Sequence, residues 1–380
     1  MTAADAYIDS LELFGMRFGL ERMHGLLDSL GNPERCFDAV HVVGTNGKGS
    51  TTLYAEALLL HEGIATGAYL SPHLTSFRER IRLGGAEIEP PAYEAAVLRV
   101  REAVGADVTQ FEALTAAAFV AFASAGVAWA VVEAGLGGRL DATNVLARSR
   151  VQVLTNVSLE HTELLGDTRE AIAAEKVAVV PAGGVVVVGE PGWEGFVPQA
   201  RTFRQVTVDG TYQDQNRAVA HAAIELALGR PIDPAPMLAV RIPGRMEVRS
   251  TAPLEIWDGA HNPAGMRRLV SELPGIVGDR RCVAVFSTLG EKDVGAMVAL
   301  LRQVCPTIVA TQSTNSRALA ADTLSALTGG PAEPDPVVAR ERALALAGPS
   351  GAVVVCGSLY LLHDLTTSSA GAGTAPAAVH

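Results

Sequence analysis

The fold of this chain is decided by the stretch His41-Val-Val-Gly-Thr-Asn-Gly-Lys-Gly-Ser50, in which an apolar strand runs into a glycine-rich turn. Glycines let backbone N–H groups converge on an anion, and a helix predicted over residues 51–62 adds its N-terminal dipole. Lys48 directly follows Gly47, and such a Gly-Lys pair is typical of phosphate-binding loops. We therefore predict a nucleotide site formed by Gly44, Thr45, Asn46, Gly47, Lys48, Gly49, Ser50 and Thr51.

The loop departs from the strict Walker pattern G-x-x-x-x-G-K-[ST] by one position. Gly49 falls where Ser or Thr normally stands, so the hydroxyl for a magnesium ion would come from Ser50 or Thr51. The alternative is a glycine turn with an incidental lysine. Three glycines, a Gly-Lys pair, hydroxyls and a preceding strand together favour the phosphate loop.

Short β-rich runs alternate with helical stretches on both sides of the loop. This alternation indicates a mainly parallel sheet covered by helices, and a proline-rich connector at 230–245 separates two such regions. We predict an α/β protein with a larger nucleotide- and metal-binding domain over 1–240, a smaller α/β domain over 241–367 and a disordered tail over 368–380. The predicted strands are 41–43, 65–69, 127–132, 151–154, 185–188, 254–257, 282–286, 307–310 and 352–355.

Composition excludes several classes of function. The net charge is -11 and there is no basic block, which argues against nucleic acid or an anionic membrane as partner. The cysteines form no CxxC pair, so we expect reduced thiols and no zinc site. The uncharged run Ala113–Val132 contains Ser124-Ala-Gly126 and predicts a buried helix, a turn and a strand rather than a membrane span. With no signal peptide at the N-terminus, we expect a cytoplasmic protein, and we expect a monomer.

Beyond the loop, several segments resemble those of the folylpolyglutamate synthase/dihydrofolate synthase family, a branch of the Mur ligase superfamily. Gly44-Thr-Asn-Gly-Lys-Gly-Ser50 is the family's form of the phosphate loop, and Glu133-Ala-Gly-Leu-Gly-Gly-Arg-Leu-Asp-Ala-Thr-Asn144 is similar to its E-x-G-x-G-G-x-x-D-x-T-N pattern. The resemblance runs from about residue 40 to 362 and implies a Mur-ligase-like fold. Other similar segments are Ser71-Pro-His-Leu74, Thr109-Gln-Phe-Glu112, Leu159-Glu-His161, Glu175-Lys176 and Gly357-Ser-Leu-Tyr360.

The resemblance implies an ATP-dependent ligase that joins L-glutamate to a folate-type carboxylate. Amide formation in water is uphill, so ATP would give its γ-phosphoryl group to the carboxylate, and the amine would attack the acyl phosphate. Positioning and electrostatic shielding then carry the catalysis. Dihydropteroate and tetrahydrofolate both stay open as acceptors. Two rivals also stay open: a Mur-type ligase for another acid, and a P-loop nucleotide-binding regulator without ligase activity.

Magnesium and a modified lysine are the expected cofactor chemistry, together with a monovalent cation. Glu133 ends a buried strand, where a carboxylate suits magnesium, although it could equally bond a neighbouring helix. The first metal ligand would be Ser50. The resemblance implies that His161 joins Glu133 at a second magnesium, although imidazole is an unusual magnesium ligand. It also implies that Lys176 is carbamylated; an ordinary helical lysine is the alternative.

The remaining predicted contacts come from the resemblance. It places Asn216 near adenine, Arg245 on the phosphates, Asp258 near the ribose and His261 in the reaction zone. A capping aspartate with an exposed histidine would explain the last two without function. The predicted catalytic set is Lys48, Lys176, Arg245 and His261. Predicted substrate contacts are Ser71, Pro72, His73, Phe77, Thr109, Phe111 and Glu112 on the pterin side and Ser358 for glutamate.

Overall fold

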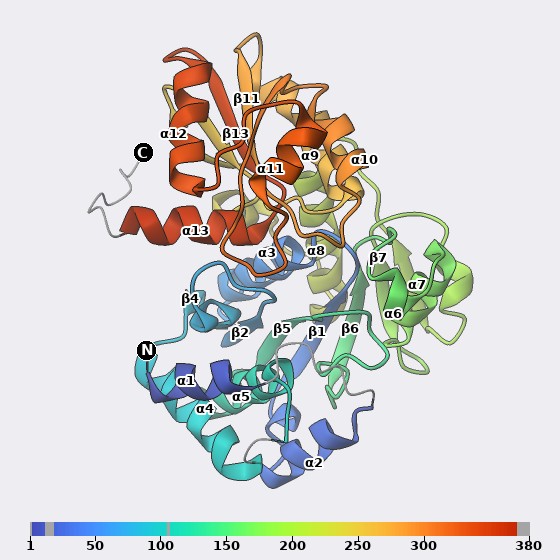
Figure 1. Cartoon of the computed structure of the whole chain (residues 1–380). Coiled ribbons are helices and arrows are strands. Elements are labelled where there is room, and N and C mark those ends of the chain that lie inside the picture. The colour runs from blue at the N-terminus through green and yellow to red at the C-terminus, as the bar shows by residue number, and fades with distance from the viewer. Residues whose placement is uncertain (1, 12–18, 105–106, 371–380) are drawn as a thin grey trace. The chain divides into compact units, whose positions relative to one another are not determined.

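The computed structural model describes residues 2–11, 19–104 and 107–370 (Figure 1). Its contacts divide the chain into two compact units, Met1–Val240 and Arg241–His380, here called unit 1 and unit 2. The division falls within the proline-rich connector 230–245. No helix among the described residues is long and apolar enough to cross a membrane.

Unit 1 is built on a sheet with the strand order β4-β3-β2-β5-β1-β6-β7-β8. From β2 to β8 neighbouring strands are parallel, and only the β2–β3 and β3–β4 pairs are antiparallel. The loop-bearing strand β1 therefore lies centrally, where both neighbours cover its backbone. The strands are β1 (Asp38–Val43), β2 (Thr66–Tyr69), β3 (Ile81–Leu83), β4 (Ala86–Glu87), β5 (Trp129–Glu133), β6 (Ser149–Leu154), β7 (Val185–Val188) and β8 (Thr202–Gln205).

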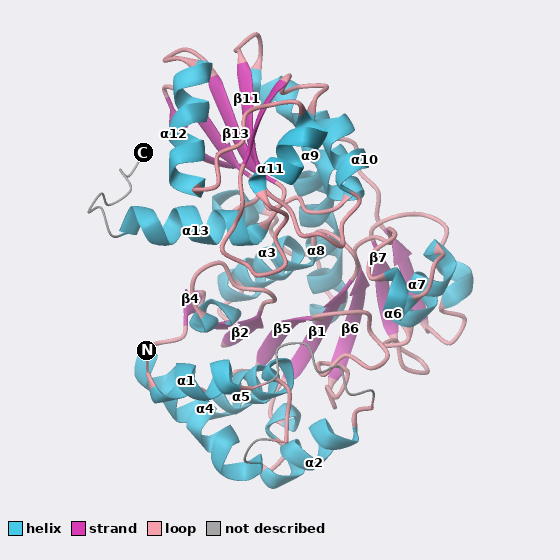
Figure 2. Cartoon of the chain, in the orientation of Figure 1, coloured by secondary structure: helices cyan, strands magenta, loops and turns pink. Residues whose placement is uncertain are grey.

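Helices cover both faces of this sheet, with α3 and α8 on one face and α4 and α5 on the other (Figure 2). This layering is what a parallel sheet needs, because both of its faces are apolar. The helices are α1 (Ala3–Ser10), α2 (Glu21–Ser29), α3 (Lys48–His61), α4 (Pro90–Val104), α5 (Gln110–Ser124), α6 (Thr162–Leu165), α7 (Arg169–Val177) and α8 (Tyr212–Leu228), with short 3₁₀ turns η1 (Pro33–Arg35), η2 (Phe77–Arg80), η3 (Glu194–Phe196) and η4 (Ala235–Ala239).

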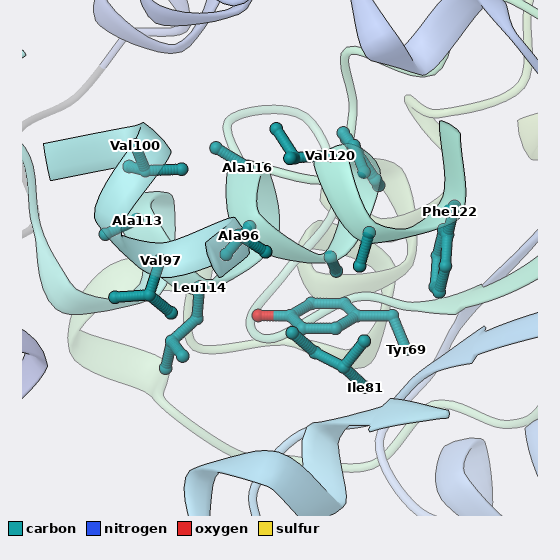
Figure 3. Packing of buried hydrophobic residues seen from close by; sticks show 14 of the residues in the cluster. Tyr69, Ile81, Ala96, Val97, Val100, Ala113, Leu114, Ala116, Val120 and Phe122 are labelled. Carbon is teal, nitrogen blue, oxygen red and sulfur yellow. The ribbon is translucent and has the colours of Figure 1, made fainter. Parts of the chain in front are cut away.

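The core beneath α4 and α5 is made of small aliphatic side chains around a few rings (Figure 3). Tyr69 on β2 lies fully buried below α5, and Phe37 packs edge-on against Phe122 with ring centroids 5.5 Å apart. Each such ring stabilises the fold by roughly 1.5–3 kcal/mol relative to an exposed one. Because several buried positions of α5 are alanine, the helix can lie close against β2.

Unit 2 has a second sheet with the strand order β12-β11-β13-β10-β9. Only β9 is antiparallel to its neighbour, so the carboxyl ends of four strands share one edge. Helices α9 and α10 lie on one face and α12 on the other (Figure 2). The elements are β9 (Glu247–Thr251), β10 (Leu254–Trp257), α9 (Pro263–Val277), β11 (Cys282–Phe286), α10 (Val294–Leu301), β12 (Thr307–Ala310), α11 (Ala321–Thr328), α12 (Pro336–Ala347), β13 (Ala352–Cys356) and α13 (Leu359–Ala370).

The predicted strands are confirmed to within a few residues, and the run Ala113–Val132 forms most of α5, a turn and most of β5. Strands β3, β4, β8 and β9 were not predicted, and they lie at or near the sheet edges. The disordered tail was predicted to begin too early. Helix α13 extends to Ala370, three residues into that segment, and 371–380 lie outside the described residues. All four cysteines are free thiols, as expected.

Candidate active site

The glycine-rich loop joins β1 to α3, and two of its residues adopt backbone conformations that favour glycine. Gly44 has φ 145° and Gly47 has φ 85°. Gly47 is also the N-cap of α3 and supplies no side-chain hydrogen bond to its first turn. A helix start without a side-chain cap leaves N–H groups for an anion, which is the geometry of a phosphate site.

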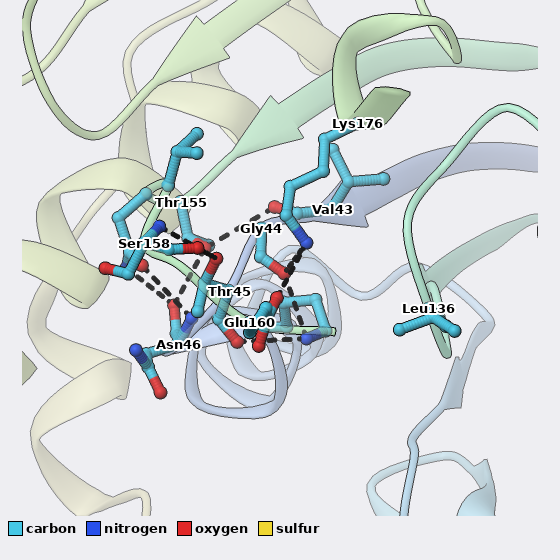
Figure 4. Close-up of polar contacts among 12 residues, drawn as sticks. Val43, Gly44, Thr45, Asn46, Leu136, Thr155, Ser158, Glu160 and Lys176 are labelled. Carbon is cyan, nitrogen blue, oxygen red and sulfur yellow. Dashed lines mark hydrogen bonds and ion pairs between the residues drawn. The ribbon is translucent and has the colours of Figure 1, made fainter. Parts of the chain in front are cut away.

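Two lysines donate to the same carbonyl of this loop, and Figure 4 shows Lys176 beside Gly44. The carbonyl oxygen of Gly44 accepts a hydrogen bond from Lys48 Nζ at 3.0 Å and another from Lys176 Nζ at 2.9 Å. Lys176 reaches it from α7, and its side chain is only 1% exposed. Lys48 therefore places a cationic group beside the backbone donors of the loop, a combination that suits a polyphosphate, and Lys176 is held against the same carbonyl.

Glu160 balances part of this charge. Its Oε1 lies 2.8 Å from Lys176 Nζ. Burial lowers the pKa of Lys176, and the attraction of Glu160 opposes but does not cancel that effect. For Glu160, burial acts to raise the pKa, yet the neighbouring Lys176 and Lys48 outweigh it, so the pKa of Glu160 is lowered. The sequence left the contact of this glutamate open, and the structure assigns it to Lys176.

The segment after β6 contacts the phosphate loop, and Figure 4 shows Thr155 and Ser158 beside Thr45 and Asn46. Asn156 uses its amide group twice on Asn46, accepting from the backbone N–H at 3.1 Å and donating to the carbonyl at 2.7 Å. Thr155 Oγ1 donates to the same carbonyl at 2.8 Å. Ser158 N–H donates to Thr45 Oγ1 at 3.0 Å. These contacts fix the loop backbone before any ligand arrives. The sequence did not single out Thr155, Asn156 or Ser158, the residues that make them.

Glu133, the last residue of β5, lies beside the first turn of α3. A Cβ on Gly49 would stand 3.3 Å from Glu133 Oε2, and the same oxygen accepts the backbone N–H of Ser71 at 3.0 Å. Ser50 Oγ accepts from Gln213 Nε2 at 3.4 Å. Thr51 Oγ1 is buried and has no hydrogen-bond partner within the described chain.

Carboxylate and hydroxyl oxygens such as those of Glu133 and Ser50 are of the kind that magnesium prefers. Among residues 2–11, 19–104 and 107–370, no three His, Cys, Asp or Glu side chains form a group that could hold a metal by themselves. Magnesium usually keeps several waters and binds through one or two carboxylates plus substrate phosphates, so a sparse set is adequate. His161 stands at the N-cap of α6 with φ 46°, and its Nδ1 is 3.8 Å from Glu163 Oε1.

Asn216 is brought to the loop by the first turns of α8. A Cβ on Gly47 would come within 2.4 Å of Asn216 Oδ1, so only glycine permits this approach. Asn216 is buried and its Nδ2 donates to Gln213 Oε1 at 3.3 Å. Gly47 of the loop and Asn216, the residue predicted for the adenine side, are therefore neighbours, although they are 169 positions apart in the sequence.

The predicted pterin-side residues fall into two groups. Thr109 and Glu112 form the capping box of α5, in which each side chain accepts the other's backbone N–H, and Glu112 Oε1 also accepts from Arg22 at 2.9 Å. The structure thus gives these two a helix-capping role. His73 and Phe77 are in edge-to-face contact at 4.7 Å between ring centroids.

The other members of the pterin-side set lie around β5. Phe111 packs on Gly135, where a Cβ would come within 2.5 Å of the ring. Ser71 is tied to Glu133 through its backbone N–H, and Pro72 is exposed. Phe111 and Ser71 therefore stand next to the strand end that carries Glu133.

In unit 2 the predicted residues gather at the carboxyl end of β10. Asp258 accepts the backbone N–H groups of Met246 and Ala260, both at 2.8 Å. It does not cap α9; that role belongs to Asn262, which accepts from Gly265 N–H at 2.7 Å. The proposed explanation of Asp258 as the helix cap is therefore wrong.

Arg245, His261 and Ser358 complete this group. Arg245 crosses Gly259, where a Cβ would meet its guanidinium at 2.4 Å. His261 Nδ1 lies 2.8 Å from the carbonyl of Gly259, two residues before α9 begins. Ser358 is buried after β13 and accepts the N–H of Tyr360 at 3.1 Å. Unit 2 thus presents a cationic side chain, a carboxylate and an imidazole near one strand end.

Comparison with known proteins defines the class first. Residues 244–359 match the family model described as Mur ligase, glutamate ligase domain. Together with the parallel, phosphate-loop sheet of unit 1, this match defines a Mur-ligase-like fold. A solved Escherichia coli FolC in complex with DHPP and ADP superposes with a TM-score of 0.89 at 27% identity, over 97% of each chain. A bifunctional folylpolyglutamate synthase/dihydrofolate synthase with Mn, AMPPNP and L-glutamate bound gives 0.88 at 28% identity, over 97% of this chain and 98% of that one.

Sequence relatives define the family. The dihydrofolate synthase/folylpolyglutamate synthase of Mycobacterium tuberculosis is 33% identical over 85% of this chain and 80% of its own length. This chain belongs to the dihydrofolate synthase/folylpolyglutamate synthase family, as its motifs suggested. A probable bifunctional folylpolyglutamate synthase/dihydropteroate synthase of Haloferax volcanii is also 33% identical, over 95% of this chain. The chain spans 50% of that relative's length.

Proposed function

We propose that this chain uses ATP and magnesium to join L-glutamate to a folate-type carboxylate, dihydropteroate or tetrahydrofolate or both, through an acyl phosphate, with ADP and phosphate as the other products. The observation that carries the proposal is that Lys48 and Lys176 both donate to the Gly44 carbonyl. The Glu133 carboxylate lies beside Gly49, in the first turn of α3. A site of this kind holds a polyphosphate and a hard cation together. The names and bound ligands of the relatives supply the substrate class.

Unit 1 would hold the nucleotide and the metal. Residues 44–51 would bind the phosphates, with Lys48 as the point charge on the β- and γ-phosphates and Asn216 toward adenine. Ser50, Glu133 and His161 would hold two magnesium ions, with a monovalent cation nearby. Bound magnesium supplies shielding of the charge that builds on the phosphates. Lys48, fixed by two loop carbonyls, is oriented before the nucleotide arrives.

Lys176 would be carbamylated in the active protein. The modification needs an uncharged amine, because the nitrogen lone pair attacks the carbon of CO₂ and the displaced proton leaves to water. Burial lowers the pKa of Lys176 and so favours that amine. Mass spectrometry of gently handled protein tests this directly. A fully active protein whose Lys176 carries no added mass would overturn it.

Unit 2, as the glutamate-ligase domain over 241–367, would supply the second set of contacts. Arg245 would meet the phosphates, Asp258 the ribose and His261 the reacting groups, with Ser358 contacting glutamate. On the acceptor side, Ser71, Pro72, His73, Phe77 and Phe111 would line the pterin, and Thr109 and Glu112 would hold α5 in place beneath it. We further propose that the protein acts in the cytoplasm as a monomer.

One experiment decides the substrate class. Glutamate-dependent ADP formation is measured side by side with dihydropteroate, tetrahydrofolate and a UDP-muramoyl acid. We expect turnover with one or both pterins and none with the muramoyl acid. Turnover with the muramoyl acid alone would identify a different Mur-type ligase. Nucleotide binding without glutamate-dependent ADP from any acceptor would identify a regulator instead.

A further inference from the structure

An ion pair outside the candidate site, formed by Glu190 and Arg169, makes hydrogen bonds to the backbone of Val157. Glu190 stands two residues after β7, and its Oε1 accepts three hydrogen bonds: from Val157 N–H at 2.7 Å, from Arg169 Nη2 at 3.0 Å and from Trp193 Nε1 at 2.7 Å. Arg169 Nε donates in turn to the Val157 carbonyl at 3.0 Å. The pair therefore engages both the N–H and the C=O of one residue.

The surroundings shield the Glu190 end of this pair, whereas the Arg169 side chain is 50% exposed. The Glu190 side chain is 21% exposed, and Trp193 beside it is buried. The Arg169 guanidinium lies 5.1 Å from the centroid of the Trp193 ring, within the range of a cation–π contact. Val157 is itself buried, so water could not readily replace the lost partners of its peptide groups.

Val157 lies in the segment Thr155–His161, which we call the brace. Its first half holds the phosphate loop through Asn156 and Ser158, as described above. Its second half carries Glu160, the partner of Lys176, and ends at His161. Val157, whose peptide groups Glu190 and Arg169 hold, thus lies between two loop-contacting residues, Asn156 and Ser158.

We propose that Glu190 is a positioning residue: with Arg169 it fixes the brace, and thereby sets the phosphate loop and Glu160 in register for magnesium–nucleotide binding. The inference rests on the proposed function only in naming MgATP as the ligand of the loop. Glu190 touches no reacting group, so its loss weakens nucleotide binding and lowers kcat much less.

The test compares four proteins as full chains. Glu190→Ala removes all three hydrogen bonds, and Glu190→Gln keeps a neutral acceptor of the same size for Val157 and Trp193. Glu194→Ala removes an exposed carboxylate from the neighbouring turn η3 and serves as the matched control. For each variant and the native chain, hydrogen exchange of the peptide covering residues 155–161 is measured without ligand, and KM for MgATP and kcat are measured in the ADP-formation assay.

In Glu190→Ala we expect faster hydrogen exchange in the brace and a KM for MgATP raised about tenfold. A tenfold change corresponds to the loss of roughly one charge-assisted hydrogen bond. Glu190→Gln should restore part of both, and Glu194→Ala should match the native chain. Unchanged exchange and KM in Glu190→Ala would overturn the inference, as would a drop in kcat with no change in KM. If Glu190→Ala does not fold, native values in Glu190→Gln for both measurements would overturn it. A native chain that forms no ADP would count against the proposed function, while the exchange data would still decide the role of Glu190.

Discussion

The close approach of Gly47 to Asn216 makes Gly47→Ala the most discriminating substitution in the phosphate loop. Two separate penalties meet at this residue. Its φ of 85° is costly for any L side chain, and a Cβ would stand 2.4 Å from Asn216 Oδ1. Gly63, just beyond the other end of α3, provides the matched control. It has φ 72° and no atom within 4 Å of an added Cβ.

The two penalties have different sizes. An alanine in the left-handed region costs about 1–2 kcal/mol, which both variants share. The overlap with Asn216 adds about 1–3 kcal/mol, typical of forcing extra atoms into a packed region. We therefore expect Gly63→Ala to destabilise by about 1 kcal/mol and Gly47→Ala by about 3 kcal/mol. Asn216 must also move away from the loop, so the KM for ATP should rise in Gly47→Ala only.

Urea unfolding of both variants gives the free energies, and ADP formation at varied ATP gives KM. Equal destabilisation by the two alanines would refute the reasoning, because it would mean that Asn216 yields without cost. An unchanged KM for ATP in a destabilised Gly47→Ala would separate the claim about packing against Asn216 from the claim that Asn216 contacts the nucleotide. It would leave the packing argument standing and remove Asn216 from the nucleotide contacts.

Three further predictions follow from buried groups. Burial lowers the pKa of His41 from its ordinary 6.5 to about 4, so on acidification the unfolded chain takes up a proton before the folded one does. Stability should hold above pH 6.5 and fall by roughly 3 kcal/mol between pH 6.5 and 4, and urea unfolding of His41→Gln should show a flatter acid limb than the native chain. Thr51→Val removes a buried hydroxyl without a partner among the described residues, so the free energy of unfolding should stay the same or rise by up to about 1 kcal/mol. If that hydroxyl is the magnesium ligand, the affinity for MgATP falls by calorimetry in Thr51→Val; if it is the Ser50 hydroxyl, the affinity falls in Ser50→Ala. Glu133→Gln keeps an acceptor for Ser71 N–H and should fold normally, while the magnesium concentration for half-maximal ADP formation rises at least tenfold, the expected cost of losing a carboxylate ligand. An unchanged magnesium requirement would remove Glu133 from the metal site.

The central strands and the phosphate loop could be predicted from the sequence because their signals are local. Val185–Val188 is four valines in a row, and the glycine-rich loop that begins at Gly44 directly follows β1 and leads into α3 at Lys48. Strands such as β4 and β8 carry no such signal. They are two and four residues long, and they form only because a neighbouring strand offers its edge.

The types of residue at the site could also be predicted, but their partners could not. Glu112 matches a family segment, and the structure shows it capping α5 and pairing with Arg22, 90 positions away. Glu190 and Arg169 resemble any surface glutamate and arginine in the sequence. Their contact with Val157 depends on β6 and β7 lying side by side, which no local pattern encodes.

The burial of Lys176 raises the question of how its charge is balanced at the phosphate loop. An ammonium with 1% exposure is tolerated only because Glu160 and the Gly44 carbonyl satisfy it. A carbamate on the same nitrogen would bring a negative charge against Glu160, and that pair of anions would need a cation to hold it together. Lys48 already lowers the pKa of Glu160, and a magnesium ion would add to this effect. Modification of Lys176 should therefore be favoured by bound magnesium and nucleotide, so the mass shift on Lys176 should be retained longest in protein kept with MgATP and bicarbonate.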